Sequence, residues 1–418
     1  MLNTHNLVST NTNFFANTTP HELIKKYGSP LYVYNEDILR ARCKELKGLV
    51  TYPNFSVNYS VKANGNLSLL KIAKDEDLNV DAMSPGEIYL EEMAGFKSEQ
   101  ILFISNNVSA EEMQYALNRN ITISVDSLSQ LEMLGKINQG GKVCVRFNPG
   151  VGAGHHEKVV TGGKKTKFGV EPTKIKEVKE ILEKYNLHLT GINQHIGSLF
   201  MEGDKYIEGI NSLLRIAMNF KDLDFIDLGG GFGIPYKKLD HQPRLDLKAL
   251  GKKLDGVLYA FAKDYGKELL FKIEPGRYIV AECGLLIGTV HSIKTNYDIK
   301  YIGTDLGFNV LNRPIMYDSH HDIEIYRIAG KPSTKSEFVT IVGNICESGD
   351  IIAKERMLPE IYENDLLGIL DAGAYGYCMA SNYNNRLRPA EVLVTTNGES
   401  TLIRKRDTFE SLVNNFIL

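Results

Sequence analysis

The sequence predicts an α/β protein, with a (β/α)8 TIM barrel followed by a C-terminal all-β domain of the sandwich or barrel-like kind. From about residue 54, short β-branched or aromatic runs alternate with longer amphipathic segments, which is typical of parallel strands joined by helices. After about residue 284, strand-like runs continue with little helix between them. We therefore expect the domain boundary near 280–290.

Composition excludes several classes of protein. The 418 residues are 43% hydrophobic and 24% charged, as in an average globular protein, so disorder and coiled coil are excluded for the bulk of the chain. A net charge of −3 gives no basic field for nucleic acid. No apolar run reaches the ~18 residues of a membrane span, and the N-terminus lacks the pattern of a signal peptide. Five well-separated cysteines favour reduced thiols in a cytoplasm.

The first elements precede the barrel. Thr19 can cap a helix, Pro20 suits its first position and Glu22 completes a capping box. The strand-like run 29–36 lies before the first barrel strand and is expected to join the β-domain.

Eight strands are expected in the barrel, within the ~250 residues that this fold needs. They are 55–61, 78–83, 101–105, 121–126, 143–148, 189–196, 225–229 and 269–274, with helices such as 67–76 and 110–119 between them. The later strands expected in the β-domain are 286–295, 300–307, 322–330, 337–344, 365–373, 390–395 and 401–406.

Active sites of such barrels lie at the carboxyl ends of the strands, where polar residues gather in this sequence. Those residues are Lys62, Asp126, Arg146, Asn148, His195, Ser198, Gly229–Gly233 and the run Glu274-Pro275-Gly276-Arg277. Ser84, Pro85 and Glu87 follow the second strand, but a helix cap with a capping box explains them.

The glycine loop Gly229–Gly233 has three possible explanations. It could be a tight turn, a dinucleotide-binding fingerprint or a cradle for an anion. The fingerprint fits poorly because its spacing is not GxGxxG and no helix opens directly after it. Loops after the seventh and eighth barrel strands often hold phosphate, and Arg277 lies in the second of them, so a phosphate-bearing ligand is favoured.

Lys62 by itself could be a surface lysine. Opposite a phosphate loop it becomes a candidate amine for covalent binding of a carbonyl. A lysine, a phosphate site and an acid, here Glu274, together indicate pyridoxal 5'-phosphate, whose ring nitrogen often binds a carboxylate. His195 could stack on the ring or be a structural histidine.

Seven motifs then carry a family resemblance: NYSVKAN, HIGS, DLGGGFG, EPGR, NRPIMY, VGNICESGD and DAGAYGYCMASNYNNR. In this order they resemble the alanine-racemase-like, fold-type III pyridoxal-phosphate decarboxylases, and they are most similar to the branch that converts meso-2,6-diaminopimelate to L-lysine and CO2. The resemblance spans roughly residues 29–396 and includes the loop 146–169. It implies a cofactor-binding barrel at 34–284 and a β-domain built from 1–33 and 285–418.

The resemblance also implies site residues and a homodimer. It assigns catalysis to Lys62, His195 and Cys346; cofactor binding to Lys62, His195, Ser198, Gly230, Gly231, Glu274, Gly276, Arg277 and Tyr375; and substrate binding to Arg277, Arg313, Tyr317, Glu347 and Tyr375. Cys346, as proton donor, and Glu347 would reach the active site of the partner subunit. Without the resemblance, Cys346 is more typical of a buried small residue and Glu347 of a solvated acid.

Alternatives remain within the same fold: decarboxylases of D-lysine, D-ornithine, arginine or carboxynorspermidine, alanine racemase, or an inactive regulatory homologue. The paired histidines His155-His156 and His320-His321 raise a metal site, but no further ligand falls at the required spacing, so no metal is expected. Two positions depart from the family pattern: Leu199 stands where relatives commonly have glutamine, and SPGE replaces a double glycine.

Overall fold

The computed structural model describes residues 7–152, 162–163, 166–327 and 335–417 and divides into two compact units. The first unit comprises Ala41–Ile234 and Arg244–Ile279, and the second comprises Met1–Arg40, Pro235–Pro243 and Val280–Leu418. The domain limits expected from the sequence, after residues 33 and 284, stay a prediction. His155 and His156 lie outside the described residues.

The first unit is a closed barrel of parallel strands in the order of the sequence, as predicted. Its strands are β2 (Phe55–Ser60), β3 (Asn79–Ala82), β4 (Ile101–Ile104), β5 (Thr122–Val125), β6 (Lys142–Arg146), β7 (His188–Asn193), β8 (Phe225–Asp227) and β9 (Leu270–Ile273). β9 pairs with β2, with Phe55 opposite Phe271, and this pairing closes the ring. A closed ring leaves no free strand edge.

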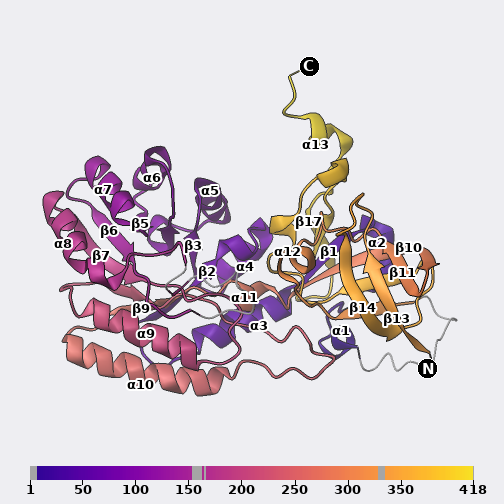
Figure 1. The fold of residues 1–418 in the computed structure, drawn as a ribbon, viewed down its shortest axis with the longest axis horizontal. Coiled ribbons are helices and arrows are strands. Elements are labelled where there is room, and N and C mark those ends of the chain that lie inside the picture. The colour runs from indigo at the N-terminus through magenta and orange to yellow at the C-terminus, as the bar shows by residue number, and fades with distance from the viewer. Residues whose placement is uncertain (1–6, 153–161, 164–165, 328–334, 418) are drawn as a thin grey trace. The chain divides into compact units, whose positions relative to one another are not determined.

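Helices lie outside these strands (Figure 1). They are α4 (Leu67–Asp75), α5 (Pro85–Ala94), α6 (Ala110–Leu117), α7 (Leu128–Ile137), α8 (Ile175–Lys184), α9 (Asp204–Ala217) and α10 (Leu247–Tyr265), while α3 (Glu36–Lys47) and α11 (Arg277–Val280) cross the limits of the unit.

The capping box expected at Ser84 is wrong in one part. The Ser84 hydroxyl accepts from Glu87 N at 3.3 Å, but the Glu87 carboxylate accepts from Met83 N at 2.7 Å and not from Ser84. Strand β3 ends at Ala82, so the N–H of Met83 lies beyond the ladder and takes this acceptor instead.

The interior of the barrel changes from apolar to charged toward the carboxyl ends of the strands. Leu102, Ile104, Cys144 and Phe225 form an apolar cluster. Strand side chains alternate between the two faces of a sheet, so the residues two further along point to the same interior. At that next layer lie Arg146 and Asp227, both buried. The carboxyl ends of the strands are therefore lined by charged groups over an apolar layer.

The second unit is built on a mixed sheet in the order β14-β13-β11-β10-β1-β16-β17, with β15 between β10 and β12. Its strands are β1 (Leu31–Asn35), β10 (Gly284–Asn296), β11 (Ile299–Thr304), β12 (Ile323–Tyr326), β13 (Ser336–Val342), β14 (Ile351–Pro359), β15 (Leu366–Ile369), β16 (Ala390–Val394) and β17 (Ser400–Arg404). β1 pairs with β10 and β16, which confirms that the early strand joins this sheet. β14 was not predicted.

The α-helices described wholly within this unit are short: α1 (Val8–Asn11), α2 (Pro20–Tyr27), α12 (Arg313–Tyr317) and α13 (Phe409–Val413). The capping box of α2 is confirmed, because Glu22 N donates to the Thr19 hydroxyl and Thr19 N donates to the Glu22 carboxylate. None of the helices in the described part of the chain combines the length and apolarity needed to cross a bilayer.

Candidate active site

Lys62 lies in the short 3₁₀ turn Val61–Ala63 that directly follows β2, and its side chain is half-buried. Its charge acts on Asp81, which is completely buried in β3. The pKa of Asp81 is raised to about 7, because the effect of burial outweighs the lowering by Lys62 and by a hydrogen bond from Ser60. The Ser60 hydroxyl lies 3.1 Å from Asp81 Oδ2 and 3.1 Å from the carbonyl oxygen of Glu274. A lysine and a buried acid therefore face each other at the first two strand ends.

Asp227 and Glu274 form a second acidic pair at the ends of β8 and β9. Both are buried, and burial raises the pKa of each carboxyl. The pKa of Glu274 is also raised by the negative charges of Asp227 and Asp81. Asp227 Oδ1 accepts from Gly229 N at 2.9 Å, whereas Asp227 Oδ2 and Glu274 Oε1 have no hydrogen-bond partner among the described residues. Ionisation of one of these two buried carboxyls therefore opposes ionisation of the other.

The glycine loop after β8 consists largely of backbone without side chains, and it packs against the carbonyl oxygens of neighbouring segments. A methyl group added at Gly230 would lie 1.8 Å from the carbonyl oxygen of Glu274. At Gly229 it would lie 2.2 Å from the carbonyl oxygen of Gln194, and at Gly231 2.3 Å from that of Gly197. Gly229 and Gly231 also have φ values of 77° and 106°. Only glycine fits at these positions, which leaves the loop open on the side away from those carbonyls.

His195 lies beside this loop. Its Nδ1 accepts from Gly230 N at 3.2 Å and lies 3.9 Å from Glu274 Oε2. Burial lowers the pKa of His195 well below its usual range, and the positive charges of Lys62 and Arg146 lower it further. The ring is therefore neutral, with its proton on Nε2.

Two residues predicted to hold a phosphate are brought together. Arg277 Nη2 donates to Ser198 Oγ at 2.9 Å, and Arg277 is 6% exposed. Leu199, next to Ser198, has a left-handed backbone with φ of 67°, which a leucine rarely adopts. Gly276 packs tightly, because a methyl group there would lie 3.0 Å from the Ala63 Cβ.

Asp126, Arg146 and Asn148 lie on the neighbouring strand ends. Burial lowers the pKa of Arg146, whose guanidinium lies 4.6 Å from the centre of the Phe168 ring. The Asn148 amide bonds to Gly163 in both directions, donating to its oxygen and accepting from its N–H at 3.0 Å each. Asn148 thus anchors the described part of the loop 150–168.

Arg313, Tyr317 and Tyr375 belong to the second unit. Arg313, the first residue of α12, is 1% exposed, and its guanidinium binds His321 and Ser319. Tyr317 ends that helix. Tyr375 is half-buried and has a left-handed backbone with φ of 56°.

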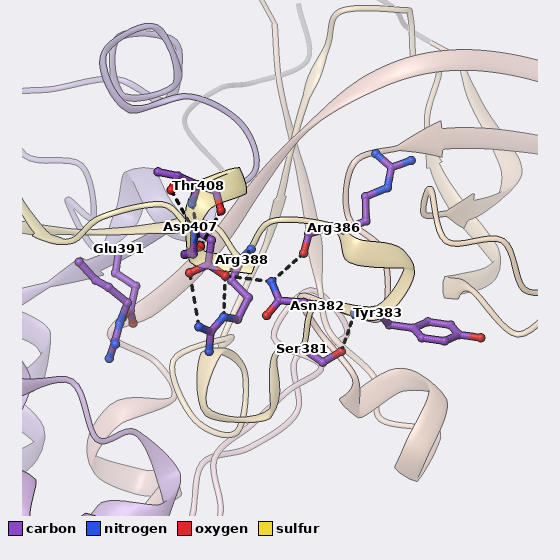
Figure 2. A network of polar contacts seen from close by, with 10 residues as sticks. Ser381, Asn382, Tyr383, Arg386, Arg388, Glu391, Asp407 and Thr408 are labelled. Atoms are coloured by element: carbon purple, nitrogen blue, oxygen red, sulfur yellow. Dashed lines mark hydrogen bonds and ion pairs between the residues drawn. The ribbon is translucent and has the colours of Figure 1, made fainter. Parts of the chain in front are cut away.

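Cys346 and Glu347, also in the second unit, are exposed. Cys346 N donates to Asn384 Oδ1 at 2.7 Å, and the Tyr383 hydroxyl donates to Glu347 Oε2 at 2.9 Å. The segment that supplies these bonds is tied down in turn, because Asp407 accepts from Asn382 at 2.9 Å (Figure 2).

In Figure 2 the Tyr383 side chain points away from Asp407 and its partners. Asp407 also accepts from Arg388 Nε at 2.8 Å. The backbone that carries Tyr383 is thus anchored through Asp407, while the Tyr383 hydroxyl binds Glu347. The Cys346–Glu347 turn is therefore stabilised by hydrogen bonds from another segment of the chain.

Comparisons with known proteins identify the family of this chain. Residues 36–281 match the family model described as "Pyridoxal-dependent decarboxylase, pyridoxal binding domain". A diaminopimelate decarboxylase from Methanothermobacter thermautotrophicus is 42% identical over 402 residues, which cover 94% of this chain and 92% of that protein. The diaminopimelate decarboxylase of Escherichia coli is 32% identical, with 98% of each chain covered. The chain belongs to the diaminopimelate decarboxylase family.

Solved structures give the same result. A diaminopimelate decarboxylase from Helicobacter pylori complexed with L-lysine matches with a TM-score of 0.86 and 31% identity, over 95% of this chain and 98% of that one. The enzyme from M. jannaschii in complex with L-lysine matches with a TM-score of 0.83 and 34% identity, over 95% and 94%. The predicted fold, cofactor and reaction class are thereby confirmed: this is a pyridoxal-phosphate-dependent carboxy-lyase.

The residues present fit pyridoxal phosphate. The glycine loop is backbone without side chains, since an added Cβ would collide with neighbouring carbonyl oxygens, and Arg277 and Ser198 offer a charged and a hydroxyl donor beside each other. Glu274 presents a buried oxygen that lacks a partner among the described residues, as a carboxyl that binds a ring nitrogen should. Lys62 supplies the amine.

Asp81 and Asp227 were not predicted as site residues from the sequence. Each is an acid near the end of an otherwise apolar strand, in LNVDAM and FIDLG, and that contrast is the signal that could have identified them. Of the four histidines considered as metal ligands, the two that the structure describes are engaged by protein groups: His320 Nε2 lies 2.9 Å from Asp322 Oδ1, and His321 binds Arg313.

Proposed function

We propose that this enzyme removes CO2 from the D-configured centre of meso-2,6-diaminopimelate and releases L-lysine. The observation that carries the proposal is the convergence of Lys62, Glu274 and the glycine loop on one end of the barrel. The nearly full-length similarity to named diaminopimelate decarboxylases supports the choice of substrate.

Pyridoxal phosphate, when bound, supplies a carbonyl for an amine and a conjugated system that accepts the electrons of the broken Cα–carboxylate bond. The chain's own residues prepare for this chemistry. Lys62 provides the amine that holds the carbonyl, and it later takes the place of the product amine. The acidic groups around Lys62 include Asp81, which can accept or release a proton near pH 7.

Glu274 holds the proton that the ring nitrogen needs. Its pKa is raised by burial and by Asp227, which favours the protonated form of this carboxyl before any cofactor binds. His195 stays neutral at the same end of the barrel, since burial lowers its pKa. A neutral ring can stack on an aromatic cofactor without adding a positive charge.

Substrate recognition depends on charge at both ends of the molecule. Arg277 and Arg313 bind carboxylates, because a guanidinium fork matches a carboxylate in two places. Tyr317 and Tyr375 contribute hydroxyl groups, and Glu347 binds the distal ammonium. A substrate that lacks the distal carboxylate loses its ion pair with the buried Arg313, at a cost of roughly 2–5 kcal/mol.

Cys346 returns a proton to Cα. We infer that Cys346 and Glu347 act in the active site of a partner subunit, so that the catalytic unit is a homodimer. Their exposure and the bracing by Tyr383 and Asn384 support this role, because the turn is open to a second chain yet held in shape. The separated cysteines favour a cytoplasmic enzyme, which fractionation of cells would test.

The decisive experiment is to measure release of lysine and CO2 from meso-diaminopimelate by the purified, cofactor-loaded protein. D-lysine, D-ornithine and L-arginine are assayed in parallel, with Lys62→Ala as the inactive control. Selective turnover of diaminopimelate is expected. Turnover of another amino acid alone would refute the substrate while leaving the cofactor in place.

A second experiment tests the shared site. Inactive Lys62→Ala and Cys346→Ala proteins are mixed under conditions where subunits are shown to exchange. Hybrid dimers should recover part of the activity, because one of their two sites then has both residues intact. No recovery would refute the assignment of Cys346 to the partner's site.

A further inference from the structure

Arg313 is held by a histidine that the proposed mechanism does not use. Its Nη1 lies 2.7 Å from His321 Nε2, and its Nη2 donates to Ser319 Oγ at 3.3 Å. The Tyr236 ring lies 4.5 Å from the guanidinium carbon and meets the His321 ring edge-on at 5.2 Å. Arg313 is 1% exposed, and His321 is 3% exposed. The guanidinium is therefore set in one orientation by buried neighbours.

The hydrogen bonds of His321 define its protonation. Its Nδ1 lies 2.7 Å from the carbonyl oxygen of Leu370, which can only accept, so Nδ1 carries a proton. Arg313 can only donate, so His321 Nε2 must offer a lone pair. The ring is therefore neutral with its proton on Nδ1, and a second proton would replace the bond to Arg313 with an N–H facing an N–H.

We propose that His321 is a positioning residue for Arg313: its neutral ring orients the guanidinium toward the substrate carboxylate, and protonation of the ring releases it. The proposal rests on the proposed function, in which Arg313 binds that carboxylate. Substrate affinity should then fall at acidic pH while the chemical step is little affected, because His321 touches neither the substrate nor the reacting atoms.

The surroundings give a protonated His321 little compensation. Arg356 Nη1 donates to the backbone oxygen of His321 at 3.2 Å, which adds a second cation nearby. The adjacent Asp322 carboxylate already binds His320 at 2.9 Å and Leu239 N at 3.0 Å.

Lys238 lies two residues after Tyr236 and forms ion pairs with Asp371 and Glu282. The negative charges of these two acids are therefore balanced by Lys238. Among the charged side chains named here, Arg313, Arg356 and Lys238 repel a positive charge on the His321 ring. The acids among them already have other partners. The arrangement favours the neutral form of His321. Protonation of the ring would therefore break its hydrogen bond with Arg313.

Two substitutions separate the hydrogen bonds of His321. In His321→Asn the side-chain amide can still donate to the Leu370 oxygen, but it is too short to reach Arg313. In His321→Gln the longer amide can place an oxygen where Nε2 stood, and that oxygen accepts from Arg313 without titrating. Arg313→Lys is the reference for loss of the fork itself.

The cofactor-loaded variants are assayed with meso-diaminopimelate from pH 5.5 to 8.5, with KM and kcat determined separately. His321→Asn should raise KM about 10-fold or more at every pH with kcat within a few-fold, as expected for loss of a bond to a charged group. His321→Gln should keep a KM near that of the wild type at pH 8 and lose the rise in KM at acidic pH. A wild-type KM in His321→Asn, with Arg313→Lys impaired, would overturn the positioning role.

A second measurement does not depend on turnover. Nitrogen NMR of the holoenzyme labelled at histidine, assigned with His321→Gln, should show the Nδ1–H tautomer of His321 at pH 8. An Nε2–H tautomer or a charged ring would overturn the proposal even if the enzyme acts on another substrate. If the tautomer is as expected but Arg313→Lys leaves KM unchanged, the role of Arg313 is refuted, and the positioning role falls with it.

Discussion

Replacing Asp81 with asparagine should stabilise the cofactor-free protein at pH 8 far more than at acidic pH. Asp81 is completely buried, and burial raises its pKa from 3.8 to about 7. When folding raises the pKa of an acid, the unfolded chain loses its proton first as the pH increases. The folded protein therefore loses stability through the window from about pH 4 to about pH 7.

The size of the effect follows from the shift. The difference between 3.8 and about 7 is about 3 units, and each unit corresponds to ~1.4 kcal/mol, so ionisation of Asp81 costs about 4 kcal/mol in full. Between pH 5 and pH 8 the portion lost is roughly 2–3 kcal/mol. Asparagine has nearly the same shape, keeps an oxygen for the Ser60 hydroxyl and does not ionise, so the variant escapes this loss.

Thermal unfolding of both cofactor-free proteins at pH 5 and pH 8 measures the effect. The gap in Tm between variant and wild type should widen by at least ~4 °C at pH 8, given roughly 2–4 °C per kcal/mol for a unit of this size. Asp77→Asn is the control, because the Asp77 side chain is 87% exposed and its replacement removes no buried charge. A gap for Asp81→Asn that is equal at both pH values, or smaller at pH 8, would refute the buried ionisation.

Three further predictions concern the cofactor and the thiol. Gly230→Ala should weaken pyridoxal-phosphate binding at least ~10-fold in absorbance titrations, because a methyl group would lie 1.8 Å from the Glu274 carbonyl oxygen; unchanged affinity would refute the cradle. Lys62→Ala should remove the peptide that becomes labelled with cofactor after borohydride reduction, as seen by mass spectrometry; persistent labelling would identify another lysine. Cys346→Ala should slow turnover sharply with cofactor still bound, whereas Cys378→Ala, at another exposed cysteine, should not; equal rates in the two variants would remove Cys346 from the mechanism.

The barrel could be predicted from the sequence because its strands are short apolar runs between helices with clear caps. The unpredicted strand β14 shows the limit of this approach. Its sequence IIAKERMLP has an exposed charged centre, Lys354 and Glu355, so it lacks the apolar alternation of a half-buried strand. It forms because β13 offers a partner, with Phe338 opposite Met357, and it ends the sheet as an edge. Such a strand is specified by a neighbour distant in sequence, and charged residues are common on edges.

The site divides in the same way. Lys62 and Glu274 could be predicted because each lies just beyond the carboxyl end of a barrel strand, which is where barrel enzymes have their active sites. The roles of Asp81 and Asp227 could not be predicted from the sequence, because their burial and mutual repulsion arise only when the barrel closes. The bond between Arg313 and His321 depends on the turn after α12, which no local pattern in the sequence describes.

The charged end of the barrel interior is a site of chemistry rather than of stability. Asp81, Asp227 and Glu274 are buried together, and the charges of Asp227 and Asp81 raise the pKa of Glu274, while Asp227 also raises that of Asp81. Apolar residues of the same size would hold the ring together better, because a buried acid that is not fully paired costs free energy. These acids instead create a place where a proton is held near a lysine and a neutral histidine. A variant that removes one of these buried charges, such as Asp81→Asn, should therefore be more stable and less active than the wild type. Such a trade-off between stability and activity is expected for active-site residues.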